Sequence, residues 1–559
     1  MRTTARCFFM LAAAVMCAAL WQPAVAAVYY VNASAAGDHG SGDAQHPFGT
    51  LAQAMKALHA GDTLNIAPGT YRETLKFPKV QWGDKQTVVQ GTGPGVIING
   101  SDVVTGWKAL GSGRYVKQPW TVNSEQVFVD GKPLQQIGGT VFGGYPKKAG
   151  HPLNKLFHGH GGVWPGRIDG GLNDMTNNSF FYDADKKSLY IQVGLKSLQG
   201  HTIEASVRPY LVQGYGLSHV TLKNIDFQHA NITSINWSGA VAMKGDHLLL
   251  DHLSVTDVDG NGADINGDDS IVRNSTFSRC GQVGLKVRGH RNKVLNNVIS
   301  YNNTRDFNKW WEAGGAKFVG QGGLQDSEVA GNRVFDNNGD GIWFDWHNAN
   351  NLIHDNISAY NKGFGIHYEA SRGASIYNNT IFGNKQRGIY LNDSSHSVIA
   401  HNLVVANGLD GIKVIDDSRA KKHPEFKPDG NSVFGNIIAW NKKTAVTLPD
   451  DASNNRSDFN LFVHAGDPVT FKKGQGAGTP PTRHTLKSWQ SKSGQDAHSW
   501  VEELHMPAAT AQALKEKKTD LQWPELKKLA SHHAVGAVPH ESAPGAPQLD
   551  HKSPPGPSK

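Results

Sequence analysis

The amino-acid sequence predicts an all-β solenoid in which short strands wind into a parallel β-helix. The first observation is a repeat: the pattern Gly-apolar-x-apolar-x begins at seven glycines, at positions 262, 284, 315, 341, 365, 388 and 411, spaced by 22, 31, 26, 24, 23 and 23 residues. The second is that polar and apolar residues alternate within each unit, which is typical of strands. The third is that such a short unit cannot bury its apolar side alone, so units must stack.

Each unit contains two or three strands, as in GIYLN, SVIAHN and LVVAN, separated by turns rich in Asn and Gly. These residues tolerate the left-handed backbone that such turns need. Three strands and three turns make one coil, with strands of successive coils about 4.8 Å apart. Asparagines recur at the same turn, and we expect them to hydrogen-bond along the stack rather than to act in catalysis: Asn297, Asn332, Asn356, Asn379 and Asn402.

The amino-acid composition says little about function, whereas the repeat strongly restricts the fold. Of 559 residues, 63 are glycine and only 38% are hydrophobic, which argues against a helix-rich globule. The formal net charge of +7 permits an acidic partner but does not identify one. Residues 1–26 have the basic start, apolar stretch and small-residue site (AVA) of an export signal, which would leave Cys280 as the single cysteine. We therefore expect a secreted or periplasmic protein without disulfides or a membrane span.

The repeats resemble those of the right-handed parallel β-helix proteins of the pectate-lyase-like superfamily. The opening stretch YYVNASAAGDHGSGDAQHPFGTLAQAMKALHAGDTLNIAPGTYRETL supports this resemblance, which implies that TLAQAMKALHAGD forms a capping helix. The predicted organisation is a β-helix over 27–460 with a β subdomain inserted at about 120–205. An irregular or helical cover over 461–540 and a Pro-rich tail over 541–559 follow it. The superfamily includes polysaccharide lyases, glycoside hydrolases, uronate epimerases and non-catalytic tail proteins, so the resemblance predicts fold better than reaction.

Strand alternation predicts which side chains face the coil interior. The apolar residues of each repeat should fill it: Leu285, Val287, Ile342, Phe344, Ile366, Tyr368, Ile389 and Leu391. The intervening residues should form one outward ladder along the coils: Asp264, Asn266, Lys286, Arg288, Lys317, Trp343, Asp345, His367, Glu369, Tyr390, Asn392 and Lys413.

Within this ladder, Asp345 and Glu369 occupy the same slot of neighbouring repeats, four residues after Gly341 and Gly365. Two stacked carboxylates repel, so one pKa should rise unless a cation lies between them. A glycosidase could use the pair as nucleophile and acid/base. A calcium ion could also bind there, with Asn392 as a third oxygen ligand. A solvated polar stripe without function is the remaining interpretation.

The ladder also carries cations beside the carboxylates, at Lys286, Arg288 and Lys317. A polysaccharide lyase must neutralise a uronate carboxylate and remove the adjacent proton, so these residues and His367 are candidate catalytic groups. Similar β-helix lyases use Lys or Arg as the base, often with calcium. A simple Asp264–Lys286 ion pair between coils is the alternative.

Two further stretches predict walls of a sugar-binding groove. The insertion FNKWWEAGGAKF carries Trp310, Trp311 and Glu312, and the loop HGHGGVWPGR carries Trp164 and Arg167. With Trp343, Tyr390 and Lys413 of the ladder, Trp311, Trp164 and Arg167 are the candidate substrate-binding residues. The spacing of His158 and His160, two residues apart, is compatible with a metal site but is weak evidence for one. For the Trp-rich insertion, the alternative interpretation is a hydrophobic plug on the outside of the β-helix.

The sequence thus predicts an exported, monomeric enzyme that cleaves a polysaccharide and binds no nucleic acid. β-Elimination of an acidic polysaccharide is slightly favoured over hydrolysis by the carboxylate pair. A uronate C5-epimerase shares the first step of the lyase, and a non-catalytic carbohydrate-binding β-helix would keep the aromatic residues without needing the carboxylates.

Overall fold

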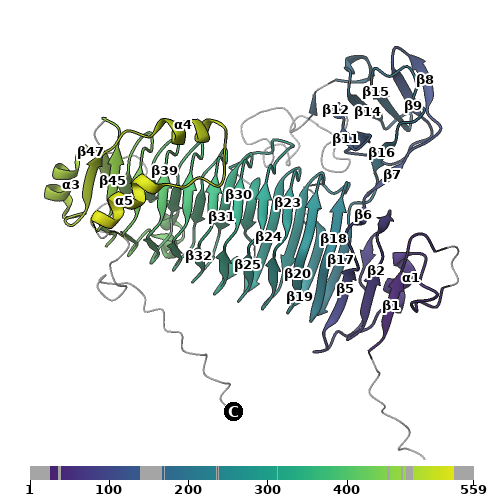
Figure 1. The fold of residues 1–559 in the computed structure, drawn as a ribbon, viewed down its shortest axis with the longest axis horizontal. Coiled ribbons are helices and arrows are strands. Elements are labelled where there is room, and N and C mark those ends of the chain that lie inside the picture. The colour runs from purple at the N-terminus through teal and green to yellow at the C-terminus, as the bar shows by residue number, and fades with distance from the viewer. Residues whose placement is uncertain are drawn as a thin grey trace, which may run out of the picture.

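The computed structural model describes residues 26–35, 40–138, 167–168, 170–233, 236, 238–310, 312–320, 322–449, 454–466, 470–473, 482–533 and 535. These residues form an elongated stack of coils with a small β subdomain beside its N-terminal part (Figure 1). The predicted all-β solenoid is therefore confirmed. None of the helices in the described part of the chain has the length and apolar character needed to cross a bilayer.

One strand from each coil joins a sheet, called the ladder sheet below, in which neighbouring strands pair in parallel until a final antiparallel pair closes it. Its strands are β4 (Leu75–Lys76), β17 (Val212–Ser218), β19 (Gly239–Asp246), β21 (Asn261–Asn266), β24 (Val283–His290), β27 (Gly314–Phe318), β31 (Asp340–Asp345), β34 (Ile366–Glu369), β37 (Ile389–Asn392), β40 (Ile412–Ile415), β43 (Val446–Leu448), β46 (Phe471–Lys473) and β47 (Thr482–His484). The short β28 (Leu324–Gln325) pairs with β24.

The other two strands of each coil belong to a second parallel sheet. One series is β22 (Ile271–Arg273), β25 (Lys293–Leu295), β29 (Glu328–Ala330), β32 (Leu352–His354), β35 (Ser375–Tyr377), β38 (Val398–Ala400), β41 (Ser432–Phe434) and β44 (Arg456–Asp458). The other is β23 (Thr276–Ser278), β26 (Val298–Ser300), β30 (Arg333–Phe335), β33 (Ile357–Ala359), β36 (Thr380–Phe382), β39 (Leu403–Val405), β42 (Ile437–Ala439), β45 (Leu461–His464) and β48 (Trp500–Glu503). Towards the N-terminus the sheet continues with β1 (Val28–Val31), β2 (Thr63–Ile66), β3 (Gly69–Tyr71), β5 (Thr87–Gly91), β6 (Val96–Asn99), β18 (Val220–Gln228) and β20 (Leu249–Thr256).

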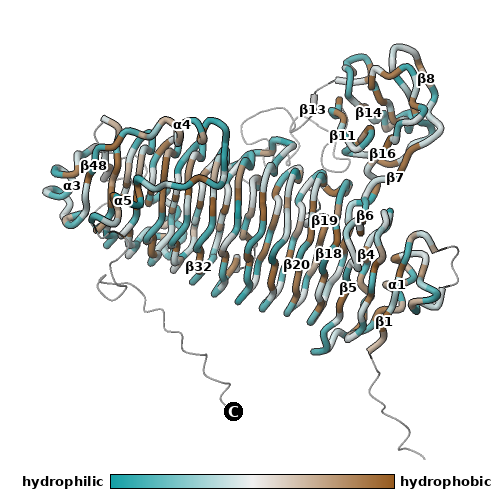
Figure 2. The backbone as a smooth tube through the Cα atoms, in the orientation of Figure 1, coloured by the Kyte–Doolittle hydropathy of each residue, from teal (hydrophilic) through white to brown (hydrophobic). Residues whose placement is uncertain are grey.

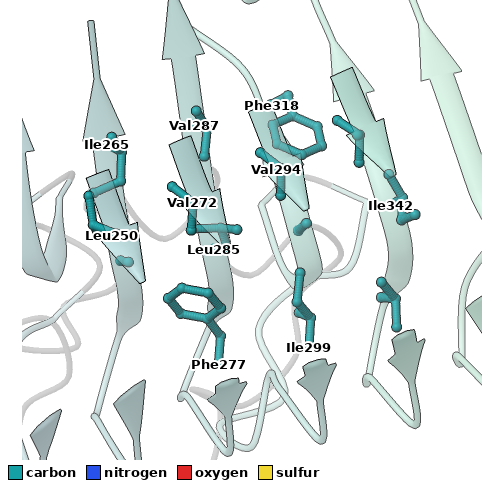
Figure 3. Close-up of a cluster of buried hydrophobic side chains, with 14 of the residues drawn as sticks. Leu250, Ile265, Val272, Phe277, Leu285, Val287, Val294, Ile299, Phe318 and Ile342 are labelled. Carbon is teal, nitrogen blue, oxygen red and sulfur yellow. The ribbon is translucent and has the colours of Figure 1, made fainter. Parts of the chain in front are cut away.

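Apolar side chains from all three strands of each coil fill the interior of the stack. Figure 3 shows Leu285 and Val287 of one coil beside Phe318 and Ile342 of the coils that follow. All eight residues predicted to face inward are buried in this core: Leu285, Val287, Ile342, Phe344, Ile366, Tyr368, Ile389 and Leu391. The alternation of apolar and polar residues repeats from coil to coil along the stack (Figure 2). Burial of this apolar surface is the main force that holds the coils together, because each Å² removed from water contributes about 25 cal/mol of stabilisation.

The repeated asparagines form a ladder of hydrogen bonds at one turn, as predicted. The side-chain oxygen of Asn379 accepts hydrogen bonds from the backbone and the side chain of Asn356, both at 3.0 Å. The side-chain nitrogen of Asn379 donates to Asn402 at 2.9 Å and to the carbonyl of Ile353 at 2.8 Å. Each buried amide is thus satisfied by its neighbours, and this turn is structural.

The inserted subdomain begins earlier than predicted, because β7 (Ser101–Val103) already leaves the coils and pairs with the last strand of the insertion. One small sheet contains β7, β10 (Val127–Val129), β11 (Lys132–Pro133) and β16 (Ile203–Ser206). The other contains β8 (Lys108–Gly111), β9 (Arg114–Lys117), β12 (Gln135–Ile137), β13 (Arg167–Ile168), β14 (Ser179–Asp183) and β15 (Ser188–Gln192), and the 3-10 turn η1 (Leu172–Asp174) precedes β14.

Both ends of the stack differ from its middle. The capping helix α1 (Leu51–Ala57) forms as the resemblance implies, and its N-cap Thr50 accepts a hydrogen bond from the backbone of Gln53. At the other end, the coils run past the predicted boundary at 460, because β46 and β48 still pair with β43 and β45. The other α-helices among the described residues are α3 (Leu486–Ser493), α4 (Ala508–Lys515) and α5 (Pro524–His532). Helix α3 adds Trp489 to the core, while Leu526 and Ala530 of α5, together with Trp523 just before it, pack along the side of the coils.

Candidate active site

Three neighbouring strands of the ladder sheet, β31, β34 and β37, bring the central candidate residues together. Asp345 pairs with Glu369, and Glu369 pairs with Asn392 on the next strand. Two positions earlier, the same register stacks Trp343, His367 and Tyr390. The predicted stacking of Asp345 on Glu369 is therefore confirmed.

These outward side chains are buried, however, which the strand alternation did not predict. Asp345 is 8% exposed, Glu369 7% and His367 4%. Two loops that lie outside the repeat send side chains onto the ladder: residues 301–313 between β26 and β27 contribute Glu312, and residues 416–431 between β40 and β41 contribute Arg419. The second loop contains the 3-10 turns η3 (Arg419–Lys421) and η4 (Pro424–Phe426). The ladder is a covered polar site rather than an open stripe.

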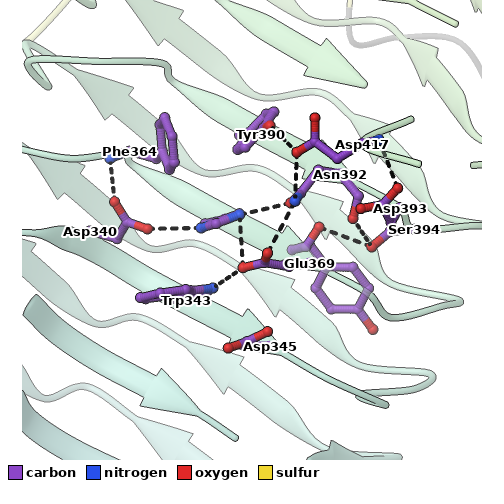
Figure 4. A network of polar contacts seen from close by, with 12 residues as sticks. Asp340, Trp343, Asp345, Phe364, Glu369, Tyr390, Asn392, Asp393, Ser394 and Asp417 are labelled. Atoms are coloured by element: carbon purple, nitrogen blue, oxygen red, sulfur yellow. Dashed lines mark hydrogen bonds and ion pairs between the residues drawn. The ribbon is translucent and has the colours of Figure 1, made fainter. Parts of the chain in front are cut away.

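The carboxylate of Glu369 lies at the centre of this site and accepts hydrogen bonds on both oxygens (Figure 4). Trp343 Nε1 donates to Oε2 at 3.0 Å, and Asn392 Nδ2 donates to Oε1 at 3.1 Å. Arg419 forms an ion pair with Oε1. Burial by itself would raise the pKa of Glu369, but the charges of His367 and Arg419 outweigh it and hold that pKa below its usual range. Glu369 is thus kept ionised.

His367 is held between acceptors on both sides of its ring. Nδ1 lies 2.8 Å from Asp340 Oδ2, and Nε2 lies 2.8 Å from Asn392 Oδ1 and 3.5 Å from Glu369 Oε2. Burial favours the neutral ring, but Glu369 and Asp340 outweigh it and raise the pKa of His367. Because both ring nitrogens face acceptors, the hydrogen bonds suit the imidazolium form, in which both nitrogens donate.

The surroundings of Asp345 shift its pKa in the opposite direction from the pKa of Glu369. Burial raises its pKa, and the nearby negative charge of Glu369 raises it further, against the lowering effect of Lys317. Lys317 Nζ lies 3.0 Å from Asp345 Oδ2 and 3.3 Å from the centre of the Trp343 ring. The other oxygen, Oδ1, is buried, and this oxygen of Asp345 has no hydrogen-bond partner in the described part of the protein.

The alternative interpretation of the remaining cations, an Asp264–Lys286 ion pair, is wrong. Asp264 and Lys286 are register neighbours, but Asp264 instead accepts a hydrogen bond from Arg288 at 2.9 Å. Lys286 forms its ion pair with Glu312 of the 301–313 loop. Burial alone would raise the pKa of Glu312, but the positive charges of Lys286 and Lys317 have the larger effect and lower that pKa. The sequence pattern of the coils could not show this, because Glu312 lies outside the repeat.

The predicted substrate-binding aromatics are not open stacking faces. The Trp343 ring packs against His367 with centroids 5.1 Å apart, and Tyr390 packs on the other side of His367 at 5.0 Å. They are 4% and 7% exposed, because the column of rings covers itself. Lys413 is register partner to Tyr390 and is 9% exposed. Trp164, Trp311, His158 and His160 lie outside the described residues, and Arg167 is described only as backbone in β13.

Sequence reasoning missed a second column beside the ladder, formed by the residues just before the repeat glycines: Asp340, Phe364, Arg387 and Asp410. Asp340 binds His367, and Arg387 Nε lies 3.0 Å from Asp410 while its guanidinium lies 4.6 Å from the Tyr390 ring centre. The charged residues that recur just before the repeat glycines could have revealed this column in the sequence. Asp417 and Arg419 of the 416–431 loop had no such signal.

The predicted calcium ligands do not fit that ion. Ca²⁺ needs six to eight oxygen ligands, whereas Glu369 is already bound by nitrogen donors and Asn392 Oδ1 faces His367. Among the described residues, no group of three or more His, Cys, Asp or Glu side chains suits a metal.

Comparison with a protein-family model supports the fold, and several solved structures are similar to the chain. The family model described as "Right handed beta helix region" matches residues 210–345, 240–375 and 325–462. A complex of XylC with xylose is 16% identical, with 85% of this chain and 82% of that chain covered and a TM-score of 0.48. A glycoside hydrolase is 13% identical (84% and 99% covered, TM-score 0.48), and the mannuronan C-5 epimerase AlgE6 A-module of Azotobacter vinelandii is 12% identical (81% and 93% covered, TM-score 0.34). No curated protein sequence matches the chain.

Strand topology and the family match together define the class of protein: a right-handed parallel β-helix with a covered polar site on its ladder sheet. The residues that the family model matches, 210–462, lie within the coils of this β-helix. Identities of 12–16% and TM-scores below 0.5 transfer no activity to it.

Proposed function

We propose that the protein is a glycoside hydrolase that works by a retaining mechanism, with Glu369 as nucleophile and Asp345 as acid/base. The observation that carries this proposal is a register-paired set of two carboxyl groups whose environments push their pKa values apart. Such a pair separates the proton donor from the ionised group, as glycoside hydrolysis requires.

The spacing of the coils favours retention over inversion. Residues paired across neighbouring parallel strands are separated by about 4.8 Å. Carboxyl groups of retaining glycosidases lie about 5 to 5.5 Å apart, whereas inverting enzymes need about 6.5 to 9.5 Å to admit a water molecule. Asp345 and Glu369 are direct register partners, so their backbone spacing suits the shorter distance.

In the first step, a Glu369 oxygen attacks the anomeric carbon and forms a glycosyl ester as the glycosidic C–O bond breaks. Asp345 gives its proton to the departing oxygen, using the carboxyl oxygen that has no protein partner. In the second step, water attacks the anomeric carbon, Asp345 takes the proton from that water, and Glu369 leaves as a carboxylate. Arg419, Trp343 and Asn392 stabilise the charge that Glu369 regains.

β-Elimination is less well supported by the same contacts. Lys286 and Lys317 are in contact with Glu312 and Asp345, so either lysine would have to lose its charge beside a carboxylate before acting as base. Both nitrogens of His367 face acceptors and leave no lone pair for a substrate proton. A lyase or epimerase would therefore have to rearrange the described site.

We also propose that the enzyme acts outside the cytoplasm after removal of residues 1–26, because those residues have the pattern of an export signal. Mass spectrometry of the protein recovered outside the cytoplasm should give an N-terminus at about residue 27. Recovery of the full-length chain in the cytoplasm alone would contradict export.

The function is tested by incubating the mature protein with neutral and acidic polysaccharides and measuring both reducing ends and the ultraviolet absorbance of unsaturated uronyl products. New reducing ends without such absorbance are expected, and both Asp345→Asn and Glu369→Gln should lose them. Glu328→Gln, at a partly exposed position on the other sheet, serves as the matched control. Rising absorbance would identify elimination and overturn the proposal.

A further inference from the structure

We infer that the site takes a neutral, hydroxyl-rich glycan rather than a uronate-containing one, an inference that rests on the proposed function and names its substrate class. The cations of the ladder suggested an acidic substrate from sequence alone. Their contacts in the folded chain point the other way.

Each cation of the described site is matched by a carboxylate. Three ion pairs lie at the N-terminal end of the site: Lys286–Glu312, Arg288–Asp264 at 2.9 Å and Lys317–Asp345 at 3.0 Å. At the other end, Arg387 binds Asp410 at 3.0 Å, and Arg419 bridges Glu369 and Asp393, the latter at 2.7 Å. Lys413 acts on Asp410 as well and helps to lower its pKa.

The balance of charge therefore does not favour an anion. Six cations (Lys286, Arg288, Lys317, Arg387, Lys413 and Arg419) face eight carboxyl groups (Asp264, Glu312, Asp340, Asp345, Glu369, Asp393, Asp410 and Asp417). Counting His367 as charged and Asp345 as protonated gives seven charges of each sign in this described set. A uronate carboxylate would enter a site whose described charges carry no net positive excess, and burying such a charge is costly.

Three buried oxygens of the same face lack donors. Asp264 Oδ1, Gln282 Oε1 and Asp345 Oδ1 have no hydrogen-bond partner among the described residues. Asp264 and Gln282 are 5% and 1% exposed, and the amide nitrogen of Gln282 is fixed on the carbonyl of Glu312 at 2.8 Å. A sugar hydroxyl can donate to such an oxygen, whereas an ionised carboxylate has no proton to give. The unmet acceptors thus select for hydroxyl groups.

An exposed indole at the edge of the site adds an apolar surface for a sugar ring. Trp310 is 54% exposed, and its ring lies 5.8 Å from that of Phe364, which in turn contacts His367 at 4.9 Å and Tyr390 at 4.7 Å. Its loop is fixed on both sides, by the buried Phe307 and by the ion pair of Glu312. The weakly polar C–H face of a neutral pyranose can pack on such a ring.

The test compares binding and cleavage of neutral and uronate-containing oligosaccharides of equal length. Glu369→Gln is used for binding by calorimetry, and the wild type for release of reducing ends. Neutral glycans should bind at least tenfold more tightly and be the ones cleaved, and Trp310→Ala should raise KM several-fold with little change in kcat. Tyr301→Ala, which removes a comparably exposed aromatic (49% exposed) that packs on Phe335 instead, should change neither.

A charge variant separates this inference from the proposed function. Glu312→Gln leaves Lys286 without its carboxylate and should increase binding of uronate oligosaccharides several-fold, whereas Glu328→Gln should not. Reducing ends released only from acidic glycans would overturn the neutral-substrate inference while leaving hydrolysis in place. Unsaturated products would overturn both. Failure of neutral glycans to bind, whether acidic ones bind or not, would also overturn the inference.

Discussion

Two ladders run along this β-helix, and they differ in how faithfully they repeat. At one turn of each coil, asparagines such as Asn356, Asn379 and Asn402 occupy the same slot and satisfy one another's hydrogen bonds. On the ladder sheet, the equivalent slots hold Asp345, Glu369 and Asn392, whose contacts are all different. A residue that repeats because each copy completes its neighbour is structural. A slot whose occupant changes and gathers side chains from loops is where we place the chemistry.

The largest effect should come from Glu369→Gln. Loss of the nucleophile should reduce kcat by about a thousandfold or more, in the upper range seen for a single catalytic group. The amide keeps the size of the carboxylate, so circular dichroism should be unchanged. A variant that retains most of its activity would remove Glu369 from the chemistry and make the two ladders equivalent.

Asp345→Asn should be nearly as damaging, but the loss should depend on the leaving group. Without its proton donor, the enzyme should lose about a hundred- to a thousandfold on natural glycans. Aryl glycosides with acidic phenol leaving groups need little proton donation, so their first step should be affected much less. Equal losses on both kinds of substrate would contradict the role of Asp345 as acid.

The pH dependence of kcat/KM sharpens the same assignment. Activity requires ionised Glu369, whose pKa is lowered, and protonated Asp345, whose pKa is raised. Activity should therefore rise as pH increases through the pKa of Glu369 and fall as pH increases through that of Asp345, which gives a bell-shaped profile bounded by these two pKa values. Asp345→Asn should remove the alkaline limb. An optimum well above neutral pH, as expected for a basic catalyst such as lysine, would argue for elimination.

The asparagine ladder should behave in the opposite way. Asn379→Ala leaves the buried backbone N–H of Asn356 without its acceptor and removes one hydrogen bond from each of the Asn356 and Asn402 side chains, which should cost about 1–3 kcal/mol of unfolding free energy for the unsatisfied group. The value of kcat should stay within twofold of the wild type under conditions where the variant is folded. Urea unfolding and steady-state kinetics on the same sample measure both. A large fall in kcat without loss of stability would refute the structural role.

The smallest effect should come from metal removal. Because the nitrogen donors around Glu369 and Asn392 do not suit calcium, EDTA should leave kcat/KM unchanged within error. A loss that added Ca²⁺ restores would show that this covered site, or a segment beyond the described residues, holds the ion after all.

How much of this could be predicted from sequence follows from what the repeat encodes. Register and interior were predictable because the same short pattern recurs, so Asp345 could be placed on Glu369 before the structure was known. Burial of the pair could not be predicted, because it depends on Glu312 and Arg419, which reach the ladder from loops of irregular length. Asp340 and Asp410 could have been predicted but were missed. Each directly precedes a repeat glycine, so a comparison of that position from repeat to repeat would have shown a second column of side chains.

The most direct test of the paired-carboxylate account is to look for the glycosyl-enzyme. Asp345→Asn, given an aryl glycoside of the sugar that the wild type releases, should accumulate the intermediate because its breakdown lacks a base. Peptide mapping by mass spectrometry should then find one glycosyl unit on the peptide that contains Glu369. An adduct on another residue, or products of inverted anomeric configuration without any adduct, would contradict the account.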